Sequence, residues 1–176
     1  MASIKRKGGV VRVQLRPEER AILSSLAGEV AQMLDSDDAG TDPLEAMVDM
    51  STEAVAAPDD PAVKRLLPDA YSDAEGAAEF RRLTDAELRR GKTDALTRLI
   101  DDLSTESAQI ELPDDVADRW LSAINDIRLV LGVRLEVTDD FGRWRDTLAV
   151  DDARQPLVAA YDWLSMVQEM LVEAIH

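Results

Sequence analysis

The sequence predicts a mainly α-helical domain with a small two-stranded β-sheet on the side of a helical bundle. Two observations lead to this fold class. Several long segments repeat apolar residues at helical spacing, and only two short segments, at residues 10–16 and 107–112, have the pattern of strands. Because a lone strand leaves backbone groups unpaired, we expect these two distant strands to pair with each other.

The first strand candidate follows a short basic segment. Val11, Val13 and Leu15 alternate with polar residues, as in a strand with one buried face. The preceding residues 1–9 contain three basic side chains and a Gly-Gly pair. We therefore expect residues 1–9 to form a flexible basic tail and residues 10–176 to form a single helical domain.

Apolar residues at helical spacing predict most of the remaining chain. The strongest stripe follows Pro113 and consists of Val116, Trp120, Ile124, Ile127, Leu131 and Leu135. We expect this helix at the centre of the core. Other helices are expected over residues 17–35, 43–57 and 62–68, up to about 82, over 86–104, and from 154 onward. Thr84 or Asp85 would cap the helix over residues 86–104.

The charge distribution argues against DNA as the partner. The 176 residues carry a formal net charge of −16, and the first 20 hold six basic and two acidic side chains, which gives +4. The remaining 156 residues therefore carry −20. A body with this charge repels phosphate backbones and attracts basic proteins. We expect a basic protein partner and no direct, sequence-specific binding to DNA.

Composition also limits the cellular setting and the chemistry. The sequence has no run of about eighteen apolar residues that could cross a membrane, and its basic start lacks the apolar stretch of a signal peptide. Without cysteine there is no thiol nucleophile, disulfide or thiolate metal site. We expect a cytoplasmic protein that needs no cofactor.

No motif of an enzyme or metal site is complete. Gly91–Thr93 resembles the end of a phosphate-binding loop, but Ala86 occupies the position of a required glycine. Asp35–Gly40 resembles a calcium loop that lacks two ligands. Aspartate doublets recur where most would begin or end an expected helix, positions at which aspartate caps the helix or faces water. These features favour a protein without enzymatic activity.

The segment "TDDFGRWRD", residues 138–146, is the candidate partner-binding site. We expect a loop or lid there, and aromatic and arginine side chains in such positions often anchor protein partners. The alternative is that the loop folds back and fills the core with both aromatic rings. The candidate contact residues are Asp139, Asp140, Phe141, Arg143, Trp144 and Arg145.

Three segments of the chain resemble one known family. "DPAVKRLLPDAY", "AEFRRLT" and "WLSAINDIRLVLGVRLEV" occur in this order and with this spacing in small acidic actinobacterial proteins, the AosR-like oxidative-stress transcriptional regulators. The similarity covers residues 10–175 and is most specific around Asn125, Asp126, Arg128 and Leu131. It implies an α-rich fold. It also implies modulation of transcription through binding to an alternative sigma factor and not through reading of DNA. RNA polymerase is a further candidate partner.

The absence of cysteine sets this chain apart from the family it resembles, in which redox sensing is attributed to a cysteine pair near the N-terminus. Our first hypothesis is a non-enzymatic regulatory protein that binds a basic transcription component through its acidic helical face and residues 139–146. The alternative is an adaptor in Clp-type regulated proteolysis, in which the N-terminal tail would contribute more. A third hypothesis is an enzyme or a metal-binding protein.

Overall fold

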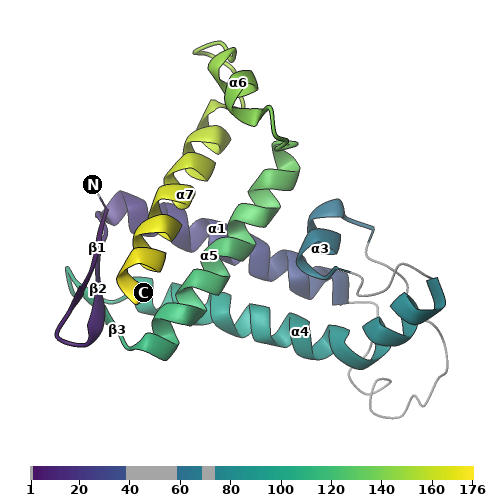
Figure 1. Cartoon of the computed structure of the whole chain (residues 1–176), viewed down its shortest axis with the longest axis horizontal. Helices are drawn as coiled ribbons and strands as arrows, with labels where there is room; N and C mark the ends of the chain where they lie inside the picture. Colours follow the sequence, from purple (N-terminus) through teal and green to yellow (C-terminus); the bar gives the residue numbers. More distant parts are fainter. Residues whose placement is uncertain (1, 39–58, 69–73) are drawn as a thin grey trace.

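Two pairs of helices cross one another in the computed structural model, which describes residues 2–38, 59–68 and 74–176 (Figure 1). The helices are α1 (Pro17–Asp38), α3 (Pro61–Leu66), α4 (Ala74–Leu103), α5 (Asp114–Arg134), α6 (Phe141–Asp146) and α7 (Gln155–Ile175). Helix α1 packs along α4, α5 packs along α7, and α3 lies against α5. The mainly helical fold class is confirmed.

Helix α5 lies at the centre of this arrangement, as its apolar stripe predicted. It contacts α1, α3, α4 and α7. Every residue of the predicted stripe is at most 9% exposed, and Ile124 and Ile127 are fully buried. Burial on several sides makes α5 the element against which the other helices are positioned.

The sheet has three antiparallel strands in the order β1-β2-β3, and it lies beside the lower part of α7 (Figure 1). The strands are β1 (Ser3–Lys7), β2 (Val10–Gln14) and β3 (Ile110–Leu112). The predicted pairing between the two distant strands is confirmed, because Val11 pairs with Leu112 and Val13 with Ile110. These four side chains are buried and join the sheet to the main core.

The expectation of a flexible tail over residues 1–9 is wrong, because Ser3–Lys7 forms the edge strand β1. The chain turns back at Gly8 and Gly9, whose φ angles of 66° and 83° suit the two-residue turns that join twisted strands. Ile4 pairs with Val13 and is only 6% exposed. Buried Ile4 and Ala2 and the Gly-Gly turn therefore help to hold a segment whose other side chains are mostly charged.

Several basic residues near the N-terminus are already bound within the molecule. The Arg6 guanidinium donates to both carboxylate oxygens of Asp114, at 2.8 and 3.0 Å. Arg20 donates to the carbonyl oxygens of Thr105 and Ser107, at 2.8 and 2.6 Å. Arg12 and Arg16 form further ion pairs with Glu111 and Glu19. These contacts use the arginines to fix the sheet and the start of α1.

The predicted helix break before residue 86 is wrong, because α4 runs without interruption from Ala74 to Leu103. Asp85 does not begin a helix. It accepts a 2.8 Å hydrogen bond from Arg89 one turn later, and Arg89 also donates to the backbone oxygen of Leu34 in α1. This contact ties α4 to the end of α1. The helix predicted over residues 43–57 lies outside the described residues.

The described residues lack two features that would point to other functions. No helix there has the length and apolar character needed to cross a membrane. In the same part of the chain, no three histidine, aspartate or glutamate side chains converge as the ligands of a metal ion would.

Candidate functional site

The candidate site lies where α5 and α7 project beyond the other helices and are joined by residues 135–154, which we call the tip (Figure 1). The expected loop over residues 138–146 is largely the short helix α6, so that part of the prediction is wrong. The backbone N–H of Trp144 donates to the carbonyl of Asp140 at 3.0 Å, which closes the first turn. Phe141 and Trp144 are consequently one helical turn apart and lie on the same side of α6.

The tip begins at a tight reversal that ends α5. The backbone N–H of Val137 donates to the carbonyl of Gly132, and that of Glu136 donates to Val133, as in a Schellman motif. The motif places Glu136 in the left-handed region, with φ of 52°. A residue with a Cβ pays a conformational cost there that glycine does not. This turn therefore fixes the direction in which the chain leaves α5, and it holds Glu136 in a strained backbone conformation.

This strain leads to a prediction at Glu136. Replacing Glu136 with glycine should raise the free energy of unfolding by about 1 kcal/mol, because the backbone conformation no longer conflicts with a side chain. Urea denaturation of the purified protein would measure the change. Glu136→Gln is the matched control, since it removes the charge but keeps the Cβ. Equal stabilisation by the two variants would show that the charge, and not the backbone, is responsible.

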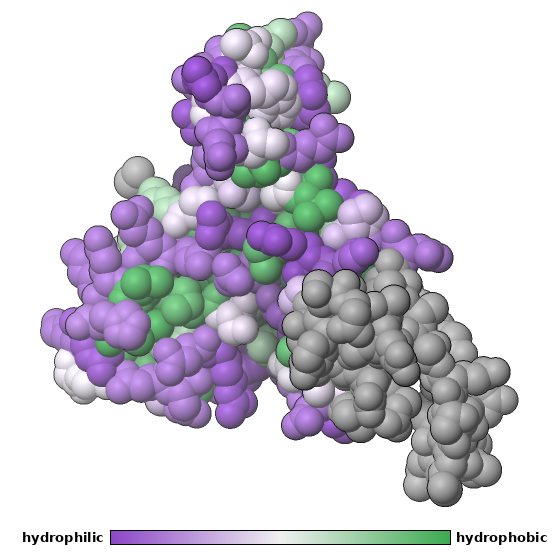
Figure 2. Space-filling view, turned by 45° about the vertical axis from the view of Figure 1, so that its right-hand side comes forward, coloured by the Kyte–Doolittle hydropathy of each residue, from purple (hydrophilic) through white to green (hydrophobic). Residues whose placement is uncertain are grey.

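Aromatic side chains give the tip a small hydrophobic cluster of its own. Leu135, Phe141 and Val158 are buried there, separately from the main core. The Phe141 ring lies 5.4 Å from the rings of both Trp144 and Tyr161, and it meets Tyr161 edge-on. The outer surface of this end of the molecule is mostly hydrophilic in Figure 2. The rings therefore fill the inside of the tip instead of the main core.

Arg154 covers the outer side of Trp144. Its guanidinium carbon lies 4.9 Å from the centre of the Trp144 ring, within the range of a cation–π contact. The same guanidinium donates to Asp152 at 2.8 and 3.0 Å. These hydrogen bonds, together with one from the backbone N–H of Arg154, lower the pKa of Asp152 to about 2. Asp152 therefore stays ionised and holds Arg154 over the ring.

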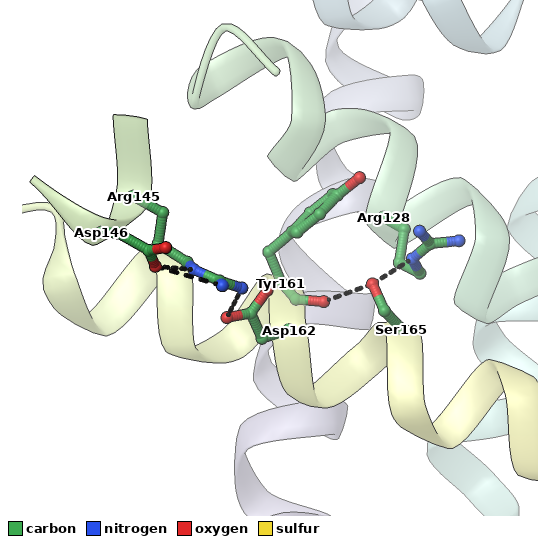
Figure 3. A network of polar contacts seen from close by, with 6 residues as sticks. All are labelled: Arg128, Arg145, Asp146, Tyr161, Asp162 and Ser165. Carbon is green, nitrogen blue, oxygen red and sulfur yellow. Dashed lines mark hydrogen bonds and ion pairs between the residues drawn. The ribbon is translucent and has the colours of Figure 1, made fainter. Parts of the chain in front are cut away.

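Arg145 links α6 to α7. Its guanidinium forms ion pairs with Asp162, at 3.1 Å, and with Asp146, at 3.3 Å (Figure 3). The nearby charge of Asp162 is the main reason that the pKa of Arg145 is raised. Arg145 is thus a positioning residue for the tip, and its charge is already balanced by two carboxylates.

A second polar network runs along the seam between α5 and α7. The Arg128 guanidinium lies 5.3 Å from the centre of the Tyr161 ring and donates to the Ser165 hydroxyl at 3.0 Å. Ser165 in turn donates to the backbone oxygen of Tyr161 at 2.8 Å (Figure 3). Arg128 also donates to Gln168. Side chains from both helices therefore hold α5 and α7 together, and these two helices position the tip.

A pocket of about 430 Å³ opens between the end of α5, α6 and the start of α7. Its lining residues are Arg134, Leu135, Glu136, Thr138, Asp140, Phe141, Trp144 and Arg154. Arg134 is held at the base by Asp60, at 2.6 Å. The pocket thus combines an aromatic wall with charged groups of both signs, and it is large enough to receive a side chain of another protein.

The structure places the six predicted site residues on one short segment but in different settings. Asp139, Asp140 and Arg143 are exposed, and Arg143 forms an ion pair with Asp140. Trp144 and Arg145 are half-buried, and Phe141 is only 9% exposed. Three of the six, Asp140, Phe141 and Trp144, line the pocket.

Sequence reasoning missed the residues that complete this site. Glu136, Arg154 and Tyr161 belong to the ends of the flanking helices, and only the fold brings them to α6. The short connection between α6 and α7 is the one signal in the sequence that places Arg154 and Tyr161 near α6. No pattern predicts that Arg154 lies over Trp144.

Comparison with known proteins identifies related sequences. The sequence profile of DUF2017, described as a domain of unknown function, matches residues 1–175. The oxidative stress regulators AosR of Mycobacterium bovis and of Mycobacterium tuberculosis H37Rv are each 33% identical over 186 residues, which span 95% of this chain and 83% of the relative. An AosR protein of Mycobacterium leprae is 31% identical over 93% of the chain and 82% of its own length. No solved structure matches the chain significantly.

Proposed function

The chain belongs to the DUF2017 family, and from that premise we propose that it is a non-enzymatic regulatory protein that binds a basic protein partner through the tip. Its mycobacterial relatives carry the name of oxidative stress regulators, which supports a regulatory role. The observation that carries the proposal is the pocket beside Phe141 and Trp144 at the projecting end of the molecule. Preformed pockets with an aromatic wall are typical positions for the anchor residues of a partner.

Charge supports a basic partner. The formal net charge of −16 attracts cationic proteins at long range. At the tip, Asp139 is exposed and has no ion pair within the described residues. We infer that the partner is a basic component of the transcription machinery, and an alternative sigma factor and RNA polymerase are the candidates. The 176 residues contain no cysteine, so they would not use a thiol to sense an oxidant.

The test compares two charge reversals of the same kind. Asp139→Lys, at the tip, should weaken binding of the partner about threefold to tenfold, chiefly through a slower association rate. Asp118→Lys, on the exposed start of α5, makes the same change in net charge away from the tip. Partners would first be captured from host cells with the tagged wild-type protein and identified by mass spectrometry. The affinity of the purified partner for each variant would then be measured.

The outcomes separate the candidate functions. If Asp139→Lys weakens binding and Asp118→Lys does not, the result supports binding at the tip. If both variants weaken binding equally, the loss comes from the change in net charge and not from a contact at the tip. Recovery of Clp subunits in place of a transcription component would favour the adaptor hypothesis. Deletion of residues 1–9 would not test that hypothesis cleanly, because it would remove β1 from the sheet. Substitution of the exposed Lys5 and Lys7 by alanine probes the same region and keeps the strand.

A further inference from the structure

Helix α7 carries an apolar row beside the residues that it buries in the core. Ala159, Trp163, Met166 and Met170 recur at intervals of four, three and four residues, so they follow one line along the helix. Ala159 is exposed, and the other three are half-buried. Trp163 and Met170 rest against the edge of the main core, whereas Met166 packs against neither hydrophobic cluster. We call these four residues the α7 row.

The α7 row is distinct from the side of α7 that stabilises the fold. The core-facing residues Leu164, Val167 and Leu171 are fully buried. The seam with α5 is polar and uses Tyr161, Ser165 and Gln168. Trp163 and Met170 therefore contact the core with part of their surface, and the remaining surface of the row lies outside both the core and the seam.

Carboxylates border the row along one edge. Asp162, Glu169 and Glu173 are exposed and lie on the same side of α7. Asp162 is paired with Arg145 of the tip, but Glu169 and Glu173 have no ion pair among the described residues. An apolar row beside two free carboxylates is complementary to a surface with apolar residues next to lysine or arginine.

We propose that the α7 row is a docking surface for an amphipathic helix of the partner, one with basic residues beside its apolar face. This inference rests on the proposed function, since it names the element of the basic partner that would be bound. An amphipathic helix presents apolar residues at the same spacing as the row, so two such rows can pack side by side. A second copy of this chain fits less well, because it would bring Glu169 and Glu173 against the same acidic edge.

The test uses a synthetic peptide of about fourteen residues in which leucines recur at helical spacing and lysines fill the other positions. Its affinity for the full chain would be measured by fluorescence anisotropy at low and at physiological salt. The double variant Met166→Gln with Met170→Gln should weaken binding roughly tenfold or more, because it removes apolar contact area at similar side-chain volume. Val172→Thr is the matched control, since Val172 is also exposed on α7 but lies off the row.

Charge is tested in the same way. Glu169→Gln with Glu173→Gln should weaken binding several-fold at low salt, whereas Asp115→Asn with Asp118→Asn removes equal charge at the start of α5 and should have little effect. A control peptide with the same composition but strictly alternating leucine and lysine should bind weakly, because its apolar residues do not line one helical face.

Three results would overturn the proposal. They are equal binding of the alternating peptide, equal loss in Val172→Thr and the methionine variant, and a dimer in light scattering that the methionine variant abolishes. The last result would assign the row to a second copy. The peptide test does not depend on the native partner. If the peptide binds specifically and Asp139→Lys leaves the affinity for the partner unchanged, binding at the tip is rejected and docking on the α7 row stands. If Asp139→Lys weakens partner binding and the peptide does not bind specifically, only docking on the α7 row is rejected.

Discussion

Replacing Trp120 with alanine should destabilise the protein more than most other single side-chain truncations, by about 4 kcal/mol. Trp120 is 1% exposed and is the largest fully buried side chain. It lies in α5, against which the other helices pack. Its indole N–H also donates to a carboxylate oxygen of Asp102 in α4, at 2.9 Å. The substitution removes both the ring and this link, and it leaves a cavity that rigid neighbours cannot close.

Chemical denaturation gives the free-energy change directly, and the melting temperature should fall by about 10 °C for a chain of this size. Trp120→Phe is the informative control. It keeps a buried aromatic ring but loses the hydrogen bond and the smaller part of the indole volume, while Asp102 retains its ion pair with Arg98 at 3.0 Å. A loss of about 1 to 2 kcal/mol is expected for Trp120→Phe. Similar losses in the two variants would show that the hydrogen bond matters more than the packing.

The elements that the sequence predicts well are those in which one periodicity extends over many residues. The stripe from Val116 to Leu135 specifies both the helix and its buried side, because only one face of a regular helix repeats every three to four residues. The pairing of residues 10–16 with 107–112 followed from a different constraint. Two strands in a helical protein have few partners other than each other.

Failures occurred where short-range signals competed. Basic residues hid the strand Ser3–Lys7, and the stronger clue was the Gly8-Gly9 turn directly before the alternating residues of β2. Thr84 and Asp85 have the composition of a cap. In the structure, the Asp85–Arg89 ion pair instead lies within a continuous α4, whose other side is held by contact with α1. Contacts with α1 therefore favour a helix that continues through Thr84 and Asp85, where the local composition also allows a helix to begin.

The candidate partner-binding site stays a prediction, and the loop that was expected there is wrong. The segment from Asp139 to Arg145 does lie at an exposed end of the molecule. The Phe141 ring, however, meets Tyr161 edge-on and also lies 5.4 Å from the Trp144 ring, over which the Arg154 guanidinium lies. Such contacts join residues from different elements, and no periodicity within the segment encodes them. The α7 row was overlooked for another reason: the same helix carries a stronger, core-facing stripe that accounts for most of its apolar residues.

The second large effect is expected at the ion pair between Lys92 of α4 and Asp126 of α5. The Lys92 ammonium lies 2.7 Å from one carboxylate oxygen of Asp126, and the two side chains are 16% and 3% exposed. The other oxygen of Asp126 has no hydrogen-bond partner in the described part of the chain. Replacing Lys92 with methionine should cost about 3 kcal/mol at neutral pH, because it leaves a buried carboxylate without its cation.

The pH dependence of this variant identifies the cause. Burial raises the pKa of Asp126 above its ordinary value, although Lys92 acts in the opposite direction. A carboxyl group with a raised pKa binds its proton more tightly in the folded state. Its ionisation therefore removes stability as the pH rises from the unfolded pKa through the folded one. Without Lys92 the folded pKa should rise further, so Lys92→Met should lose less stability at about pH 5 than at about pH 7.5.

Two comparisons complete this test. Adding Asp126→Asn to Lys92→Met should recover much of the lost stability and flatten the pH dependence, because no buried charge then remains. Lys64→Met, at an exposed lysine of α3, should change the free energy of unfolding by less than about 0.5 kcal/mol. If Lys92→Met loses the same stability at both pH values, and Asp126→Asn restores none of it, the loss does not come from an unpaired charge at Asp126 but from the packing of the new methionine side chain between α4 and α5.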